Sequence, residues 1–104
     1  QNYPNAKLNI KQENISLVIP VYNSEKSLPI LVAELEKELN IYNYEIIFVN
    51  DGSKDDSLSV LKGIVKSNPQ ITAINLAKNV GQHNAIMAGL RFAKGDIVVM
   101  MDYL

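Results

Sequence analysis

The chain alternates short apolar runs with longer segments in which apolar residues recur every three or four positions. The apolar runs cover 15–21, 46–49, 71–76 and 96–102. Their length and β-branched composition predict strands that are buried on both faces. The segments between the runs have the spacing of amphipathic helices that turn one apolar side toward a sheet. The pattern therefore predicts the order β-α-β-α-β-α-β.

Local residues indicate where the helices begin and end. Ser53 and Asp56 resemble a capping box that opens the second helix, and Asn68-Pro69 ends it. The third helix is predicted over 82–94, with Gly95 as its C′ glycine. Its small residues Ala85, Ala88 and Gly89 allow a close approach to the sheet.

Every strand is connected to the next by a helix-length segment, which predicts parallel strands with right-handed crossovers. The fold class is α/β, a Rossmann-like three-layer arrangement over residues 15–104 that follows a loosely ordered lead-in over 1–14. The pattern alone does not determine the strand order. A Rossmann-like order of 3-2-1-4 would place Tyr22, Asp51 and Asp102 at the same edge of the sheet.

Composition narrows the function classes. The 104 residues are 47% hydrophobic and 20% charged with a formal net charge of -1, which fits one small domain. Such a balance offers no basic surface for nucleic acid. Without cysteine there is neither a disulfide nor a thiolate metal site, and no apolar run is long enough to span a bilayer. A cytoplasmic location is the expectation.

The candidate chemistry lies where the strands end. An aspartate in this position is as often a turn or cap residue as a ligand, but Asp51, Asp102 and Tyr22 together favour a binding site. Carboxylates accept N–H groups of a base or bind Mg²⁺ or Mn²⁺, and a tyrosine ring can stack. His83, the single histidine, falls in the first turn of a helix, where a polar packing role is more common.

Three familiar phosphate-binding or signalling patterns are missing. No G-x-G-x-x-G follows the first strand, and no G-x-x-x-x-G-K-S/T occurs anywhere, which disfavours a dinucleotide site and a P-loop. Receiver domains carry an acidic pair after their first strand, where this chain has Pro20-Val21-Tyr22-Asn23.

Four blocks of the sequence resemble family 2 glycosyltransferases of the GT-A fold. They are VIPVYNSE at 18–25, VNDGSKDDS at 49–57, NVGQHNAIMAG at 79–89 and GDIVVMMD at 95–102. The third block is most similar to the polyprenyl-phosphate branch, which includes dolichyl-phosphate mannose synthases and undecaprenyl-phosphate glycosyltransferases. The resemblance implies that residues 15–104 form the nucleotide-sugar-binding half of a GT-A domain.

The implied activity is inverting transfer of a sugar from a UDP- or GDP-sugar to a polyprenyl phosphate. The resemblance places Tyr22 near the base, Asp51 as acceptor of the base imino N–H, and Gln82 near the diphosphate, where relatives often have a basic residue. Asp102 matches the first acid of the D-x-D motif, which binds Mg²⁺ or Mn²⁺. The full set of implied substrate-binding residues is Pro20, Tyr22, Asn23, Glu25, Asp51, Gly52, Gln82 and His83.

The resemblance weakens after Asp102, where the family has a second aspartate and this chain has Tyr103-Leu104. We therefore expect the 104-residue chain alone to bind nucleotide weakly and not to catalyse transfer. The whole protein is expected at the cytoplasmic face of a membrane. Two alternatives remain: a non-catalytic nucleotide-binding or regulatory α/β module, and a chain that pairs with its own copies through the strand at 97–101.

Overall fold

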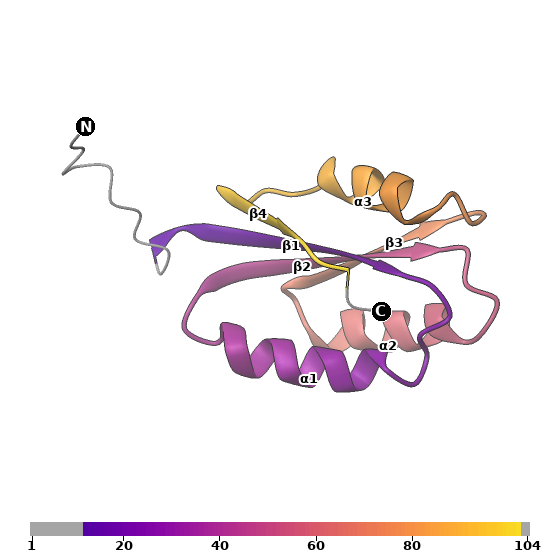
Figure 1. The fold of residues 1–104 in the computed structure, drawn as a ribbon. Helices are drawn as coiled ribbons and strands as arrows, with labels where there is room; N and C mark the ends of the chain where they lie inside the picture. The colour runs from indigo at the N-terminus through magenta and orange to yellow at the C-terminus, as the bar shows by residue number, and fades with distance from the viewer. Residues whose placement is uncertain (1–11, 103–104) are drawn as a thin grey trace.

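The computed structural model describes residues 12–102, which form a parallel sheet between two helical layers (Figure 1). The sheet order is β3-β2-β1-β4, and every neighbouring pair is parallel. The strands are β1 (Asn14–Val21), β2 (Asn43–Asp51), β3 (Ile71–Leu76) and β4 (Ile97–Met100); the helices are α1 (Leu28–Leu39), α2 (Ser57–Ser67) and α3 (Gln82–Leu90). The α/β class, the element order and the strand order 3-2-1-4 are confirmed. Most of the predicted lead-in lies outside the described residues.

The two faces of the sheet bury separate sets of side chains because alternate residues of a strand point to opposite faces. Leu17, Ile19 and Phe48 belong to the larger core, which α1 and α2 cover. Val18 and Ile47 belong to the smaller core under α3. The continuous apolar runs of β1 and β2 are therefore explained by helices on both sides of the two central strands.

Helix α3 lies close to the sheet because its inner face is built from small residues. A Cβ atom on Gly89 would come within 2.5 Å of Val18 Cγ1 and 2.8 Å of Val49 Cγ2. Ala85 is also fully buried. The close approach expected from these residues is confirmed.

The predicted end of α3 is wrong. The helix ends at Leu90 instead of Lys94, and Gly95 is not its C′ residue. Gly95 is instead packed against β1: its N–H donates to Ser16 Oγ (2.8 Å), and a Cβ there would lie 2.7 Å from the Asn14 carbonyl oxygen. The glycine is required by close packing, not by a helix terminus.

The prediction of a buried fourth strand over 96–102 is also wrong. Strand β4 has four residues at the edge of the sheet, and Val98, Val99 and Met100 are 39%, 42% and 59% exposed. Helix α3 packs on β1 and β2, which leaves β4 at the margin. Apolar composition alone does not distinguish this edge strand from a central one.

Candidate functional site

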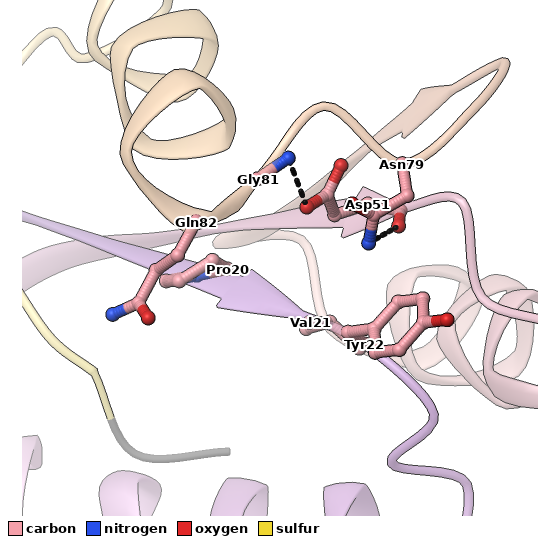
Figure 2. Close-up of a pocket in the computed structure, with 7 residues that line it drawn as sticks. All are labelled: Pro20, Val21, Tyr22, Asp51, Asn79, Gly81 and Gln82. Atoms are coloured by element: carbon pink, nitrogen blue, oxygen red, sulfur yellow. Dashed lines mark hydrogen bonds between the residues drawn. The ribbon is translucent and has the colours of Figure 1, made fainter.

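A cavity of about 360 Å³ lies where β1 and β2 end, next to the start of α3 (Figure 2). It is lined by Pro20, Val21, Tyr22, Asp51, Asn79, Gly81 and Gln82. Its volume lies within the usual range for small-molecule sites, and it opens at the carboxyl ends of parallel strands, where α/β proteins bind ligands.

The strand register brings Tyr22 and Asp51 to this cavity. Val21, the last residue of β1, pairs with Asn50 of β2, so Tyr22 and Asp51 lie at the same level: Tyr22 follows β1, and Asp51 is the last residue of β2. Pro20 sits just before this exit. Its partner on β2 is Val49, whereas β4 pairs with β1 only as far as Val18, so the missing proline N–H interrupts no ladder on that side.

Asp51 is a buried carboxylate that holds the β3–α3 loop. It is 3% exposed. Its Oδ1 accepts the Val80 N–H (2.7 Å). Its Oδ2 accepts the Gly81 N–H (3.1 Å), and Asn79 Nδ2 donates to the Asp51 carbonyl oxygen (3.1 Å) (Figure 2). Hydrogen bonds from backbone amides compensate the charge of a buried carboxylate. Hydrogen bonds thus connect Asp51, at the end of β2, to the β3–α3 loop that forms one wall of the cavity.

Gly52 lets that loop cross directly over β2. Its φ of +65° lies in the left-handed region, and a Cβ at this position would come within 2.3 Å of Asn79 N. A glycine is therefore required twice, by conformation and by space. The close approach of residue 79 to Gly52 becomes evident only in three dimensions.

The opposite wall is held by the β2–α2 loop and by Ser57, the first residue of α2. The three successive N–H groups of residues 23–25 donate to Ser53 Oγ (3.0 Å), Ser57 Oγ (2.8 Å) and Asp55 Oδ2 (3.2 Å), in that order. The backbone that follows Tyr22 is therefore attached to the neighbouring loop at each residue.

The capping box predicted for Ser53 and Asp56 is wrong. Helix α2 begins at Ser57, and its N-cap residue Asp56 makes no side-chain capping bond. Asp55 Oδ1 instead accepts both the N–H (3.0 Å) and the hydroxyl (2.6 Å) of Ser57. Ser53 thus links two loops, and Asp55 both bonds the first residue of α2 and accepts an N–H from the segment after β1.

The hydrogen bond from the Ser57 hydroxyl, assisted by backbone N–H groups, holds the pKa of Asp55 below its ordinary value. The ionised side chain therefore stabilises the fold at neutral pH, and this contribution is lost as the pH falls through the lowered folded-state pKa.

We expect the free energy of unfolding of the wild type to approach that of Asp55→Asn below about pH 4. Urea unfolding of both proteins between about pH 7 and pH 2.5 measures the difference between their free energies of unfolding. A difference that stays constant over this pH range would contradict the prediction. Asp56→Asn is the matched control.

The predicted site residues separate into two groups. Pro20, Tyr22, Asp51 and Gln82 line the cavity, although the Gln82 side chain points away from Asp51, past Pro20 (Figure 2). Gly52 lies under the crossing loop. The remaining predicted residues, Asn23, Glu25 and His83, do not line the cavity.

Asn23 and Glu25 take part in the loop contacts instead. Asn23 has a left-handed φ of 48°, and its Oδ1 accepts the Lys54 N–H (2.8 Å). Glu25 participates through its backbone N–H. His83 is exposed in the first turn of α3.

Asp102 is exposed, two residues after β4, and does not line the cavity. Met100 pairs with Val18 of β1, so Asp102 lies at the same carboxyl edge of the sheet as predicted, but only Tyr22 and Asp51 line the cavity. Within residues 12–102, no cluster of three or more His, Cys, Asp or Glu side chains could hold a metal ion. A single carboxylate can still bind Mg²⁺ or Mn²⁺ when substrate phosphates supply further oxygens.

Three lining residues were not in the predicted set, namely Val21, Asn79 and Gly81. The last two belong to the block at 79–89 that carries part of the family resemblance, but they were not among the residues implied to bind substrate. Their contact with Asp51 joins residues about 30 positions apart, and no local pattern predicts it.

The model of the family described as "Glycosyl transferase family 2" matches residues 16–103. The chain belongs to glycosyl transferase family 2. Among curated family members, the "Prophage bactoprenol glucosyl transferase homolog" of Escherichia coli K12 is 42% identical over 91 residues, which are 85% of this chain and 29% of the relative. An undecaprenyl-phosphate 4-deoxy-4-formamido-L-arabinose transferase of Pseudomonas savastanoi pv. phaseolicola is 46% identical over 92 residues, 85% of this chain and 27% of the relative.

Solved glycosyltransferase structures share the fold. Residues 1–349 of S. aureus TarS in complex with UDP-GlcNAc match with a TM-score of 0.71 and 25% identity over 86% of this chain and 26% of TarS. The mannosyltransferase PcManGT of Pyrobaculum calidifontis, in complex with GDP-Man and Mn²⁺, matches with a TM-score of 0.68 and 22% identity over 86% of this chain and 27% of PcManGT. The GT-A fold implied by the family 2 resemblance is confirmed.

The chain spans less than a third of the curated family 2 relatives that it matches. In those relatives, the matched part is therefore one portion of a longer protein.

Proposed function

We propose that the cavity binds the nucleotide part of a UDP- or GDP-sugar, and that the whole protein transfers the sugar, with inversion, to a polyprenyl phosphate. The observation that carries this proposal is the cavity at the ends of β1 and β2, with an exposed aromatic ring and a buried carboxylate in its lining. The bactoprenol and undecaprenyl-phosphate relatives support the acceptor class.

Base binding is assigned to Tyr22 and Asp51. The Tyr22 side chain is 40% exposed at the cavity, so its ring face is accessible for stacking. Each Asp51 oxygen already accepts one backbone N–H, but an ionised carboxylate has about four acceptor positions. Asp51 can therefore accept the imino N–H of uracil or guanine without releasing the β3–α3 loop.

The diphosphate is assigned to the side of the cavity near Gln82. No lysine or arginine is among the lining residues, and the neutral Gln82 side chain cannot balance the charge of a diphosphate. A divalent cation held by Asp102 and the phosphate oxygens would supply that charge and act as a Lewis acid toward the departing diphosphate. Mg²⁺ and Mn²⁺ both suit these oxygen ligands.

The acceptor chemistry requires little from the protein beyond orientation. A polyprenyl phosphate is already anionic near neutral pH, so its oxygen can attack the anomeric carbon without a strong general base. The new C–O bond forms as the bond to the nucleoside diphosphate breaks on the opposite side, which inverts the configuration. This chain would contribute by fixing the position of the nucleotide.

The location and partners of the protein also belong to the proposal. Within residues 12–102, no helix is long and apolar enough to cross a membrane. We infer that the site faces the cytoplasm, where nucleotide sugars are available, and that the whole protein contacts the membrane that holds its lipid acceptor. Pairing of copies through the exposed edge of β4 also stays a prediction.

An NMR titration of the chain with UDP and with GDP, each with and without Mn²⁺, tests nucleotide binding directly. We expect the amide signals of Tyr22, Asp51 and Gly81 to shift and those of Ser16 and Gly95, at the opposite end of the sheet, to stay in place. A response to only one nucleotide would identify the base. Absence of cavity-specific shifts with both nucleotides would contradict the proposal.

A further inference from the structure

We propose that Asp55 and Ser57, neither of which lines the cavity, are positioning residues that set the place of Tyr22 in the cavity wall. The inference rests on the proposed function for its effect on nucleotide binding. Its structural basis is a chain of hydrogen bonds that runs from the start of α2 to the Tyr22 carbonyl group.

The direction of each hydrogen bond in this chain is fixed. An ionised Asp55 can only accept, so the Ser57 hydroxyl donates to Asp55 Oδ1 (2.6 Å). Its proton is then committed, and the Ser57 oxygen accepts the Ser24 N–H (2.8 Å). The Ser24 hydroxyl in turn donates to the Tyr22 carbonyl oxygen (2.9 Å). The negative charge on Asp55 thus orients the Ser57 hydroxyl, and Ser24 continues the connection by donating its backbone N–H to Ser57 and its hydroxyl to the Tyr22 carbonyl oxygen.

Neighbouring contacts fix the same stretch of backbone from both sides. Asn23, directly after Tyr22, donates its N–H to Ser53 Oγ (3.0 Å). The second oxygen of Asp55 accepts the Glu25 N–H (3.2 Å). Asp55 therefore accepts from both ends of the chain: from Ser57 with one oxygen and from the 23–25 segment with the other.

Burial prevents water from replacing the central contact of the chain, the hydrogen bond from the Ser24 N–H to Ser57 Oγ. Ser24 and Ser57 are 6% and 0% exposed, so an N–H or hydroxyl that loses its partner there is left without one. The Tyr22 side chain, in contrast, is 40% exposed. Because packing encloses only part of the ring, its position depends on the backbone, and the backbone depends on Asp55 and Ser57. A ring held in place before binding loses less freedom when a base stacks on it.

Asp55→Asn tests the inference with almost no change in side-chain size. If the amide oxygen faces Ser57, the amide NH₂ faces the Glu25 N–H; if the amide is flipped, the NH₂ faces the Ser57 N–H. In either orientation two donors oppose each other, so one contact is lost. We expect the dissociation constant for the better-bound nucleotide to rise about tenfold. In the whole protein, KM for the sugar nucleotide should rise similarly while kcat changes less than about twofold.

Two further variants separate positioning from general destabilisation. Asp56→Asn removes the same charge from the next residue, whose side chain makes no capping bond, and should bind nucleotide like the wild type. Ser57→Ala should weaken binding as Asp55→Asn does, and Ser57→Thr, which keeps the hydroxyl, should restore it. The amide shifts of Ser24 and Glu25 in the absence of ligand report whether each variant has released the loop.

The outcomes distinguish the inference from the proposed function. If the wild type binds neither UDP nor GDP, the proposed function fails, whereas the ligand-free amide shifts still test the hydrogen-bond chain. If the wild type binds and a folded Asp55→Asn variant binds equally well, the inference is overturned. Equal weakening by Asp56→Asn would also overturn it, since the effect would then follow charge rather than contact.

Discussion

Replacing Gly52 with alanine is expected to lower the free energy of unfolding by roughly 3 to 5 kcal/mol. The new Cβ would lie 2.3 Å from Asn79 N and 2.6 Å from the Lys78 carbonyl carbon, and both are backbone atoms. Backbone cannot move aside as a flexible side chain does, so either the β3–α3 loop must lift from β2 or Gly52 must leave its φ of +65°. Urea unfolding of the purified chain measures the change.

Gly63→Ala is the matched control for this prediction. Gly63 lies inside α2, and a Cβ there would meet no heavy atom within 4 Å. Alanine favours the helix over glycine, so the same substitution should stabilise the chain by roughly 0.5 to 1 kcal/mol. If both variants changed stability in the same direction and by similar amounts, crossing of the loop over β2 at Gly52 would be contradicted.

The overall fold was predictable because its signals are local and repeated. The apolar runs of β1 and β2 are buried on both faces as their composition predicts, and Ile71–Leu76 forms a strand with the predicted limits. Helix-length crossovers then leave few topologies for a parallel sheet. Tyr22 and Asp51 could be predicted at the cavity because Tyr22 directly follows β1, Asp51 ends β2, and these two strands are neighbours at the centre of the sheet.

The errors arise where the outcome depends on tertiary contacts. Gly95 follows a helical segment as a C′ glycine would, but its actual constraint is the Ser16 side chain on β1. Strand β4 has the composition of a buried strand, yet it is exposed because α3 packs on β1 and β2 and does not cover it. Asp55 looks like one more residue of an acidic loop, and only the folded chain shows that it binds the backbone beyond Tyr22.

Hydrogen bonds to a single segment, residues 50–57, therefore fix both walls of the cavity. The strand end and loop at 50–57 bind the segment after β1 through Ser53, Asp55 and Ser57, and the segment before α3 through Asp51. A change in this loop can alter the cavity without touching a ligand. Effects on fold and on binding must consequently be measured separately for each residue.

Among substitutions of cavity residues, Asp51→Asn should cause the largest losses of both stability and nucleotide binding. An asparagine keeps the shape but replaces one acceptor oxygen with an NH₂ group, which then faces the N–H of Val80 or Gly81. With residue 51 only 3% exposed, the unpaired donor should cost roughly 1 to 3 kcal/mol of stability. Loss of a charged acceptor for the base imino N–H should raise the dissociation constant for nucleotide by at least about tenfold.

Asn79→Ala separates the two roles of Asp51. It removes the hydrogen bond from Asn79 Nδ2 to the Asp51 carbonyl oxygen and leaves the carboxylate intact, so it loosens the loop but keeps the acceptor. Calorimetric titration with UDP and GDP, alongside urea unfolding, should show Asn79→Ala weakening binding less than Asp51→Asn does at comparable loss of stability. Equal affinities for the two variants would mean that Asp51 acts only by holding the loop, and the base would then have to be recognised by other groups in the cavity.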